Sequence, residues 1–237
     1  MRLSCWRVAA VVGLSGLLLA AVPSSASGAS RAADEEIADA GLLTAADFPA
    51  GWTELPPDTS DDGEIEQAAR SIPSCKRYLT LRTTAKKQPR GESPEFELGE
   101  SQVDNSVTVF SSTSSANAAM KLFSHPSVLQ CINQLFSDVF EEQLAADPET
   151  RDVVTGVDVD IEKANVEQVG DSTRAYEGTV VLSANDGSSA TIGLGTAAVR
   201  TGRAVAVYSY VVDAPEVVQL LPGLVDVSIA RLDAALA

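Results

Sequence analysis

Three tyrosines and an arginine in the second half of the chain have the chemistry to line a ligand cleft. Tyr208 and Tyr210 are two positions apart, so they share one face of a strand, while Tyr176 and Arg174 fall in an earlier strand candidate. Aromatic side chains commonly line ligand pockets, and a guanidinium can engage an anionic group. We therefore predict ligand-binding roles for Tyr176, Tyr208, Tyr210 and Arg174. The alternative is that the tyrosines are core or sheet-surface residues and that the arginine pairs with acidic side chains.

Residues for acid–base or nucleophilic catalysis are scarce. The chain holds 1 His, and His125 precedes Pro126 at the end of a helix candidate, where a surface or capping role is expected. The sequence has no G-x-S-x-G nucleophile motif, no P-loop and no G-x-G-x-x-G after a strand. We predict that the protein is not an enzyme and that it needs no cofactor. A secreted hydrolase that uses a pair of carboxylates is the catalytic alternative, although no pair stands out.

Two acidic segments carry the oxygen ligands that a cation prefers, yet neither fits a site. Residues 58–66 match the first nine positions of an EF-hand calcium loop, but Ala69 occupies the twelfth, which requires a bidentate Glu. Asp158, Asp160 and Glu162 alternate with apolar residues and project from one face of a strand, where burial of three like charges would be unfavourable. We predict no metal site, an acidic exposed loop over residues 55–63 and a solvated face for the acidic strand.

The N-terminus has the pattern of a secretory signal peptide. Two arginines precede an uncharged run over residues 8–22, and small residues follow. We predict a signal peptide over residues 1–29, with cleavage after Ala26 or Ala29, and a protein that is secreted or held in the extracytoplasmic cell envelope. The alternative is an uncleaved membrane anchor, but a spanning helix needs about 20 apolar residues and this run is shorter. No transmembrane anchor is expected after cleavage.

The charge balance is strongly acidic, with 17 Lys+Arg against 33 Asp+Glu and a net charge of −16. The predicted signal peptide carries two of the basic residues and no acidic ones, so cleavage after Ala29 leaves 15 basic and 33 acidic side chains, a net charge of −18. Such a surface repels a phosphate backbone, so we predict no nucleic-acid partner. The concentrated basic stretch of the chain lies in a polar segment over residues 86–94, which we predict to be a loop.

The cysteines predict a single disulfide. Of the 3 cysteines, Cys5 falls inside the predicted signal peptide, which leaves Cys75 and Cys131. In an oxidising compartment an even pair is most simply a disulfide. Closure of a loop of roughly 55 residues would stabilise the fold by about 4 kcal/mol in the loop-entropy model. The chain has no C-x-x-C pair that would indicate a redox role. We predict a structural Cys75–Cys131 bridge, with free thiols as the alternative.

Helical spacing of apolar residues marks several segments. A helix is favoured over residues 63–72, and a run of serines offers N-caps for a helix that ends at Phe123. A stronger helix continues to about Ala146, with apolar residues at intervals of three and four that form one face. Residues 214–236 return to this spacing, and Pro222 is expected to kink or restart that helix.

Strand patterns dominate the second half of the chain. Residues 103–111 and 157–161 read as strands, and residues 174–183, 190–199 and 203–212 are three further candidates. Short connections that contain glycine separate these last three, which is typical of hairpins. A three-stranded antiparallel meander follows from this pattern.

Helices and antiparallel strands that segregate along one chain predict a single α+β domain, here over residues 47–237. Residues 47–52 are punctuated by Pro and Gly and are predicted to be a loop, with Phe48 and Trp52 closing an edge of the core. Residues 30–46 are predicted to be a flexible N-terminal segment.

Short motifs along the chain follow an order that is typical of one family. They are the loop Asp47–Trp52, Cys75, a strand leading into a Ser/Ala-rich helix at Val107–Phe123, Cys131, a V-G-D turn at Val169–Asp171 and a V-R-x-G-x-x-V hairpin at Val199–Val205. This order resembles the extracellular sensor domain of mycobacterial PknH-type receptor kinases, which also occurs in secreted proteins and lipoproteins of actinobacteria. The likeness covers most of residues 40–236.

The resemblance implies a curved antiparallel sheet with helices packed on one face, a cleft that binds a ligand, and no catalytic residues. The chain departs from its relatives because it can form one disulfide where two are common, and because it lacks a kinase domain, a transmembrane segment and a lipobox.

Together these features predict an exported, non-enzymatic domain of the bacterial cell envelope that binds a ligand or acts in a sensor-like way. Its partner would be an unknown small molecule or envelope component. The alternative is a structural or protein-interaction module that contacts another envelope protein through a helix face or the acidic loops.

Overall fold

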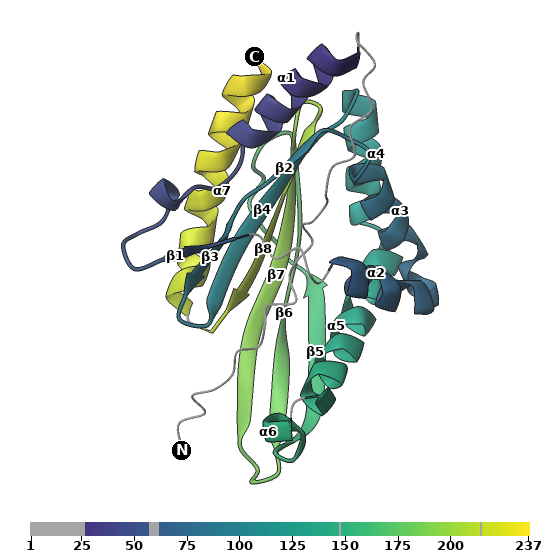
Figure 1. Cartoon of the computed structure of the whole chain (residues 1–237), viewed down its shortest axis with the longest axis vertical. Coiled ribbons are helices and arrows are strands. Elements are labelled where there is room, and N and C mark those ends of the chain that lie inside the picture. The colour runs from purple at the N-terminus through teal and green to yellow at the C-terminus, as the bar shows by residue number, and fades with distance from the viewer. Residues whose placement is uncertain (1–26, 57–61, 147, 214) are drawn as a thin grey trace.

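One antiparallel sheet forms the centre of the structure, and helices lie along both sides of it (Figure 1). The computed structural model describes residues 27–56, 62–146, 148–213 and 215–237. The predicted signal peptide lies outside these residues apart from its last three positions, which begin helix α1 (Ser27–Ala40). Residues 57–61, which include most of the predicted acidic loop, also lie outside them.

The longest strands form a meander in the second half of the chain. β5 (Val154–Lys163), β6 (Ser172–Ala184), β7 (Ser189–Thr201) and β8 (Ala204–Val212) each pair with the next in antiparallel register. Gly202, in the β7–β8 connection, has a φ of 52°, in the left-handed region that glycine adopts without strain. The predicted meander is confirmed, and the acidic side chains that alternate along β5 are exposed as expected.

The first half of the chain extends the sheet beyond β8. β4 (Ser101–Val109) pairs with β8, β3 (Glu95–Leu98) pairs with β4, and β1 (Thr53–Leu55) forms the edge beside β3. β2 (Arg90–Glu92) also pairs with β4. The prediction of a loop over residues 86–94 is therefore wrong at β2, because pairing with β4 supplies a strand that the local sequence does not indicate.

Four helices cover one face of the sheet. They are α2 (Asp62–Ser71), α3 (Lys76–Ala85), α4 (Thr113–Phe123) and α5 (Pro126–Ala146). The two short segments η2 (Pro73–Cys75) and α6 (Pro148–Arg151) lead into α3 and follow α5. The buried side chains that these helices share with the sheet include Val180, Leu182, Leu194, Ala198 and Val205.

Local signals account for where α4 and α5 begin. The Ser112 hydroxyl accepts a hydrogen bond from the Ser115 backbone N–H at 3.2 Å, which is an N-cap. The Nδ1 atom of His125 accepts one from the Ser127 N–H at 3.1 Å, just before α5. Pro126 is the first residue of α5, where the missing N–H does no harm. The capping role predicted for the single histidine is confirmed.

Helices also cover the opposite face, where α1 packs against α7 (Pro215–Leu236) and both pack against the sheet. The α+β class and the antiparallel sheet are confirmed, but the expectation of helices on one face is wrong. The reason is visible in β8, where Val205 belongs to one core while Ala204 and Ala206 belong to the other. A strand buried on both faces reads as a continuous apolar run and needs a cover on each.

The N-terminal segment also differs from its prediction. Residues 30–46, predicted to be flexible, form most of α1 and lead into the short turn η1 (Ala45–Asp47). Ala38 is fully buried, and the Leu43 N–H donates to Asn105 Oδ1 at 2.8 Å. Arg203 Nη2 donates to Asp34 Oδ1 at 2.5 Å and joins α1 to the β7–β8 connection. The partners in these contacts lie far from residues 30–46 in the sequence, so the local composition gives no sign of them.

Helix α7 continues through Pro222, so the helix does not restart there. The backbone carbonyl that loses its partner belongs to Val218, which is exposed, so water can replace the missing donor. Within the described ranges, no helix combines the length and the apolar character needed to cross a membrane.

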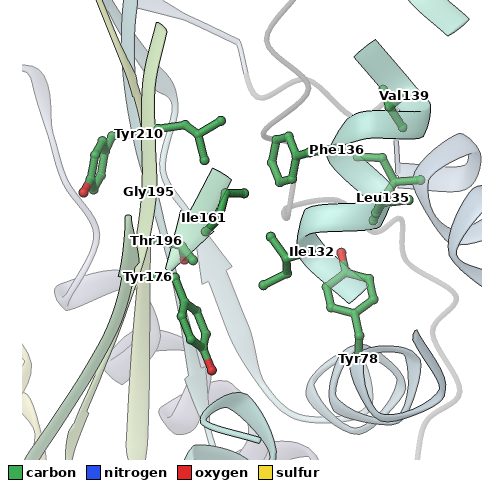
Figure 2. Close-up of a pocket in the computed structure, with 12 residues that line it drawn as sticks. Tyr78, Ile132, Leu135, Phe136, Val139, Ile161, Tyr176, Gly195, Thr196 and Tyr210 are labelled. Atoms are coloured by element: carbon green, nitrogen blue, oxygen red, sulfur yellow. The ribbon is translucent and has the colours of Figure 1, made fainter. Parts of the chain in front are cut away.

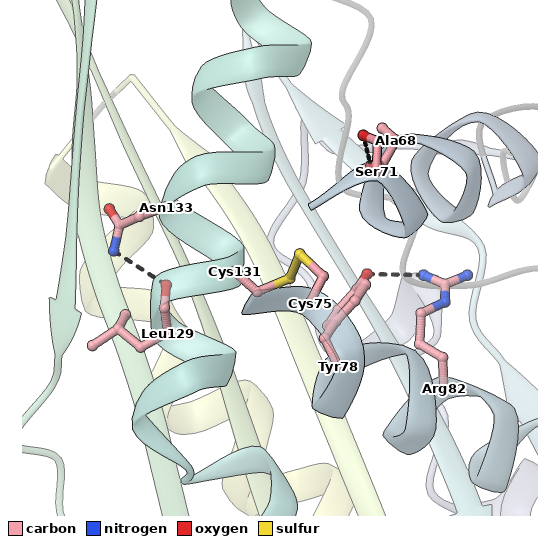
Figure 3. The surroundings of a disulfide bond; sticks show 8 residues. All are labelled: Ala68, Ser71, Cys75, Tyr78, Arg82, Leu129, Cys131 and Asn133. Carbon is pink, nitrogen blue, oxygen red and sulfur yellow. Dashed lines mark hydrogen bonds between the residues drawn. A yellow bond between two sulfur atoms is a disulfide. The ribbon is translucent and has the colours of Figure 1, made fainter. Parts of the chain in front are cut away.

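The predicted disulfide and the predicted aromatic edge are both present. Figure 3 shows the Cys75–Cys131 bond, which joins the start of α3 to α5, with the two Cα atoms 4.7 Å apart. The ring of Phe48 stacks on Phe96 with centroids 4.2 Å apart and lies 4.8 Å from the ring of Trp52. The loop over residues 47–52 thus closes one edge of the second core.

Candidate ligand-binding groove

Two adjoining cavities lie between the helical layer and the sheet. The first lies between α2 and α5 on one side and β5 to β7 on the other, and the second lies between α3 and α4 and strands β4, β7 and β8. Tyr78, Ile132 and Thr196 line both, so we treat the two as one groove. Their volumes are about 620 and 810 Å³, with the solvent at their mouths included.

The lining of the first cavity is almost entirely apolar. Figure 2 shows Ile132, Leu135 and Val139 of α5 on one side of it and Ile161 and Tyr176 of the sheet on the other. The α5 residues recur at three and four positions, so they belong to the apolar face that the helical spacing predicts. Part of that face packs into the core and part borders open space.

Thr196 is the polar exception in the middle of the groove. Its side chain belongs to β7 between Tyr176 of β6 and Ser209 of β8, and only 8% of the residue is exposed. The Oγ1 atom has no hydrogen-bond partner among the described residues. A buried hydroxyl without a partner destabilises a fold by about 1–3 kcal/mol. A group that enters the groove can supply the missing partner.

Tyr176 and Tyr78 face the groove with their aromatic rings, because their hydroxyls are already hydrogen-bonded within the protein. The Tyr176 hydroxyl donates to the Phe123 carbonyl at 2.7 Å, and burial raises its pKa above the ordinary value. The Tyr78 hydroxyl accepts from Arg82 Nη1 at 3.2 Å. Both phenols are neutral hydrogen-bonding groups with partners in the protein, so an occupant meets mainly their apolar faces.

Three cations of the described chain border the second cavity: Arg82 of α3, Lys86 directly after that helix and Arg90 of β2. The Glu66 carboxylate contacts Lys86 Nζ and lies 3.5 Å from Arg82 Nε. Burial acts to raise the pKa of Glu66, but the hydrogen bond and charge of Lys86, together with Arg82 and Arg70, outweigh it and hold that pKa below its ordinary value. Glu66 is therefore an anion at neutral pH.

The predicted cleft of three tyrosines does not form, because β8 turns two of them to the other face of the sheet. The Tyr208 hydroxyl donates to Ser228 Oγ at 2.7 Å beneath α7, where burial raises its pKa. Tyr210 borders the first cavity beside Gly195, yet its ring lies on the far side of β7 from the helices (Figure 2). It leaves no room for a Cβ at Gly195.

Arg174 is not part of the groove either. Its guanidinium is exposed and donates to the carbonyl of its neighbour Thr173 at 2.6 Å. The remaining predicted residue, Tyr176, does line the first cavity. The alternation of side chains along β8 was predictable, but which of its faces meets α5 depends on the order of strands and helices.

Sequence reasoning missed the residues at the centre of the groove and around its second cavity. Thr196 sits in a strand of ordinary pattern, and nothing local shows that its hydroxyl is buried. A signal did exist for Lys86 and Arg90, because they belong to the concentrated basic stretch of an acidic chain. That stretch lies beside the sheet because α3 ends and β2 begins within it.

Comparisons with known proteins show a weak structural similarity and no family. No family model matches it, and no curated protein matches it. Among solved structures, the extracellular domain of PknH from Mycobacterium tuberculosis aligns with 83% of this chain and 96% of its own, at 13% sequence identity and a TM-score of 0.36. The chain is thus weakly similar in structure to that domain, and its family is not assigned.

Proposed function

We propose that this protein is an exported, non-enzymatic binding domain that holds an apolar small molecule in the groove between its helices and its sheet. The observation that carries the proposal is the pair of adjoining cavities lined by apolar side chains, with the unpartnered Thr196 hydroxyl where they meet. Protein interiors are close-packed, so two adjoining apolar cavities are more readily explained by an occupant than by the fold's own stability.

The lining favours binding over catalysis. The titratable side chains that border the two cavities within the described chain are tyrosines, arginines and a lysine. At neutral pH none of these is a ready proton acceptor, since the phenols are neutral and the cations are protonated. Export is supported by the signal-peptide pattern over residues 1–29 and by the buried Cys75–Cys131 bridge, a feature of oxidising compartments.

The experiment is a titration of the oxidised protein with N-phenyl-1-naphthylamine, a neutral apolar dye that fluoresces strongly out of water. We expect saturable binding with one dye per chain. Val139 lines the first cavity and is only half-buried, so Val139→Trp adds bulk at the groove without crowding the closed core. This variant should bind the dye at least about tenfold more weakly.

The matched control is Val227→Trp, the same substitution at an exposed position of α7 on the other face of the sheet. It should bind the dye as the wild type does. Absence of saturable binding in the wild type, or equal binding by both tryptophan variants, would show that the groove does not hold an apolar molecule.

A further inference from the structure

The second cavity has hydroxyl side chains on its sheet wall that the first cavity lacks. We propose that the groove holds a single-chain lipid with an uncharged head that carries hydroxyls, such as a monoacylglycerol. Its acyl chain would lie in the first cavity, and its glycerol head would lie in the second, against Ser106, Thr108 and Thr196. This inference rests on the proposed function and adds to it the class of ligand and its direction in the groove.

Three short hydroxyl side chains line the second cavity from the sheet: Ser106 and Thr108 of β4 and Thr196 of β7. None of the three residues is more than 9% exposed. Ser106 lies opposite Val207 of β8, which lies opposite Ala198 of β7, so these three side chains share one face of the sheet. Thr108 and Thr196 are two positions from Ser106 and Ala198, so they share that face as well. A ligand group with several hydroxyls can both donate hydrogen bonds to such side chains and accept hydrogen bonds from them.

The charged side chains at the second cavity favour an uncharged head, because they already have partners within the protein. Lys86 and Arg82 lie beside the Glu66 carboxylate, and Arg90 contacts Glu92. A charged head would have to compete with an existing partner and would also lose its own hydration. Uncharged hydroxyls can add hydrogen bonds and leave these ion pairs in place.

The path from this polar wall to the apolar end of the groove is continuous. Tyr78, Ile132 and Thr196 line both cavities, so an occupant can extend from one into the other. Beyond them, the first cavity offers aliphatic and aromatic walls with no charged side chain in its described lining (Figure 2): Ile65, Leu135, Phe136, Val139, Ile161 and Leu194. Such walls suit an acyl chain and disfavour a second polar group.

Thr196 marks the place where the head of the lipid would meet its chain. This residue lines both cavities, and its hydroxyl has no hydrogen-bond partner among the described residues. In a monoacylglycerol the head and the chain meet at the ester, whose carbonyl oxygen accepts a hydrogen bond. Donation from Thr196 to this oxygen would give the buried hydroxyl the partner that it lacks.

The test is displacement of N-phenyl-1-naphthylamine from the wild type by three compounds with the same dodecanoyl chain: 1-monododecanoylglycerol, methyl dodecanoate and dodecanoate. All are used below the concentrations at which they aggregate. We expect the glycerol ester to displace the dye at about tenfold lower concentration than either of the others. A purely apolar groove would instead prefer the methyl ester, because it has no hydroxyls to remove from water.

Variants locate the head and the ester separately. Thr108→Val should weaken the glycerol ester several-fold and leave the methyl ester unchanged, whereas Thr196→Val should weaken both esters, since both have the carbonyl. The affinity of each variant for the dye should stay near that of the wild type. Thr191→Val is the matched control, because Thr191 is exposed on β7 and does not line the groove. Should Thr108→Val fail to fold, Ser106→Ala removes a second hydroxyl from the same wall and makes the same test.

The outcomes separate this inference from the proposed function. If the dye binds in the groove but the methyl ester or dodecanoate displaces it as well as the glycerol ester does, the inference is overturned and the groove remains a site for apolar molecules. If Thr191→Val weakens the glycerol ester as much as Thr108→Val does, the head does not lie against β4 and its placement is wrong. If the dye does not bind, the proposed function fails, and this inference fails with it.

Discussion

Thr196 is a residue at which stability and binding should oppose each other. Its buried hydroxyl has no partner among the described residues, so Thr196→Val removes a polar group that folding leaves unsatisfied. We expect the free energy of unfolding of the ligand-free protein to rise by about 1 kcal/mol. Valine has nearly the same shape and favours strands. Urea denaturation followed by circular dichroism measures the change.

Thr201 gives the control for this prediction within the same strand. It is 4% exposed, but its hydroxyl donates to Asp233 of α7. Thr201→Val should therefore lower the free energy of unfolding by about 1–2 kcal/mol, since the substitution leaves the carboxylate without its donor. A loss of stability in Thr196→Val of the same size would mean that the Thr196 hydroxyl does have a partner.

Tyr210 should make the fold sensitive to alkali. Burial, with the nearby charge of Glu177, raises the pKa of Tyr210 to about 12, against about 10 in an unfolded chain. The folded state thus favours the neutral phenol, so its contribution is fully present below pH 10 and is lost as the pH rises towards 12. We expect Tyr210→Phe to lose less stability than the wild type over that range, by about 2 kcal/mol.

Urea denaturation at pH 9 and at pH 11.5 checks this difference. The two proteins should diverge only at the higher pH, because at pH 9 the phenol is neutral in both the folded and the unfolded chain. Equal losses of stability at pH 11.5 would show that Tyr210 is ionised without penalty in the folded state.

The residue scale also shows what a sequence can and cannot indicate. Cys75, Cys131 and the capping His125 were predicted correctly because pairing and capping depend on few groups near them. The predicted place of Tyr208 in a ligand cleft was wrong. Alternation along β8 puts Tyr208 on the same face as Tyr210, but it does not show which element covers that face. In the structure α7 covers it.

Among the elements, α3 and α5 set the shape of the groove, and the disulfide holds them together. Cys75 precedes α3, which carries Arg82 and is followed by Lys86. Cys131 lies on α5 next to the lining residue Ile132. Reduction should therefore affect both stability and binding. The loop-entropy model gives a loss of about 4 kcal/mol in the free energy of unfolding.

The measurement compares the wild type with and without dithiothreitol, and with the double variant Cys75→Ser/Cys131→Ser. We expect a lower urea midpoint and weaker binding of N-phenyl-1-naphthylamine in the reduced protein, and no response to dithiothreitol in the double variant. A reduced protein that loses stability but binds the dye as before would show that other contacts fix α3 against α5.

Elements with strong local patterns were predicted well, and those that depend on distant partners were not. The meander over β6 to β8 follows from alternation and from glycine turns. In contrast, β2 exists only as a partner of β4, and α1 is held by Asn105 through Leu43 and by Arg203 through Asp34. Neither partner is recognisable from the neighbouring sequence.

At the scale of the whole molecule, the sheet separates two cores with different roles. One core lies under α2 to α5 and contains the groove, and the other lies under α1 and α7 and has buried contacts such as Ser228 to the Gly41 carbonyl at 2.5 Å. The sequence predicted one covered face, so it missed this division. The largely apolar run of β8 was the available sign of it.

This division predicts that α1 stabilises the protein without shaping the groove. A chain that begins at Ser30 keeps Asp34 and the buried Ala38, whereas one that begins at Gly41 loses both and uncovers the second core. We expect the two predicted cleavage sites, after Ala26 and after Ala29, to give proteins of equal stability. Removal of residues 27–40 should lower the free energy of unfolding by about 2 kcal/mol or more.

Urea midpoints of the three chains measure the stability, and dye titration at low temperature measures the groove in the folded fraction. Because α1 packs on the face opposite the groove, the shortest chain should bind N-phenyl-1-naphthylamine as the others do while it remains folded. Equal midpoints would contradict the role of α1 in the second core. Loss of dye binding in a chain that is still folded would show instead that the two faces of the sheet are coupled, because a change under α7 would then reach the side chains beneath α5.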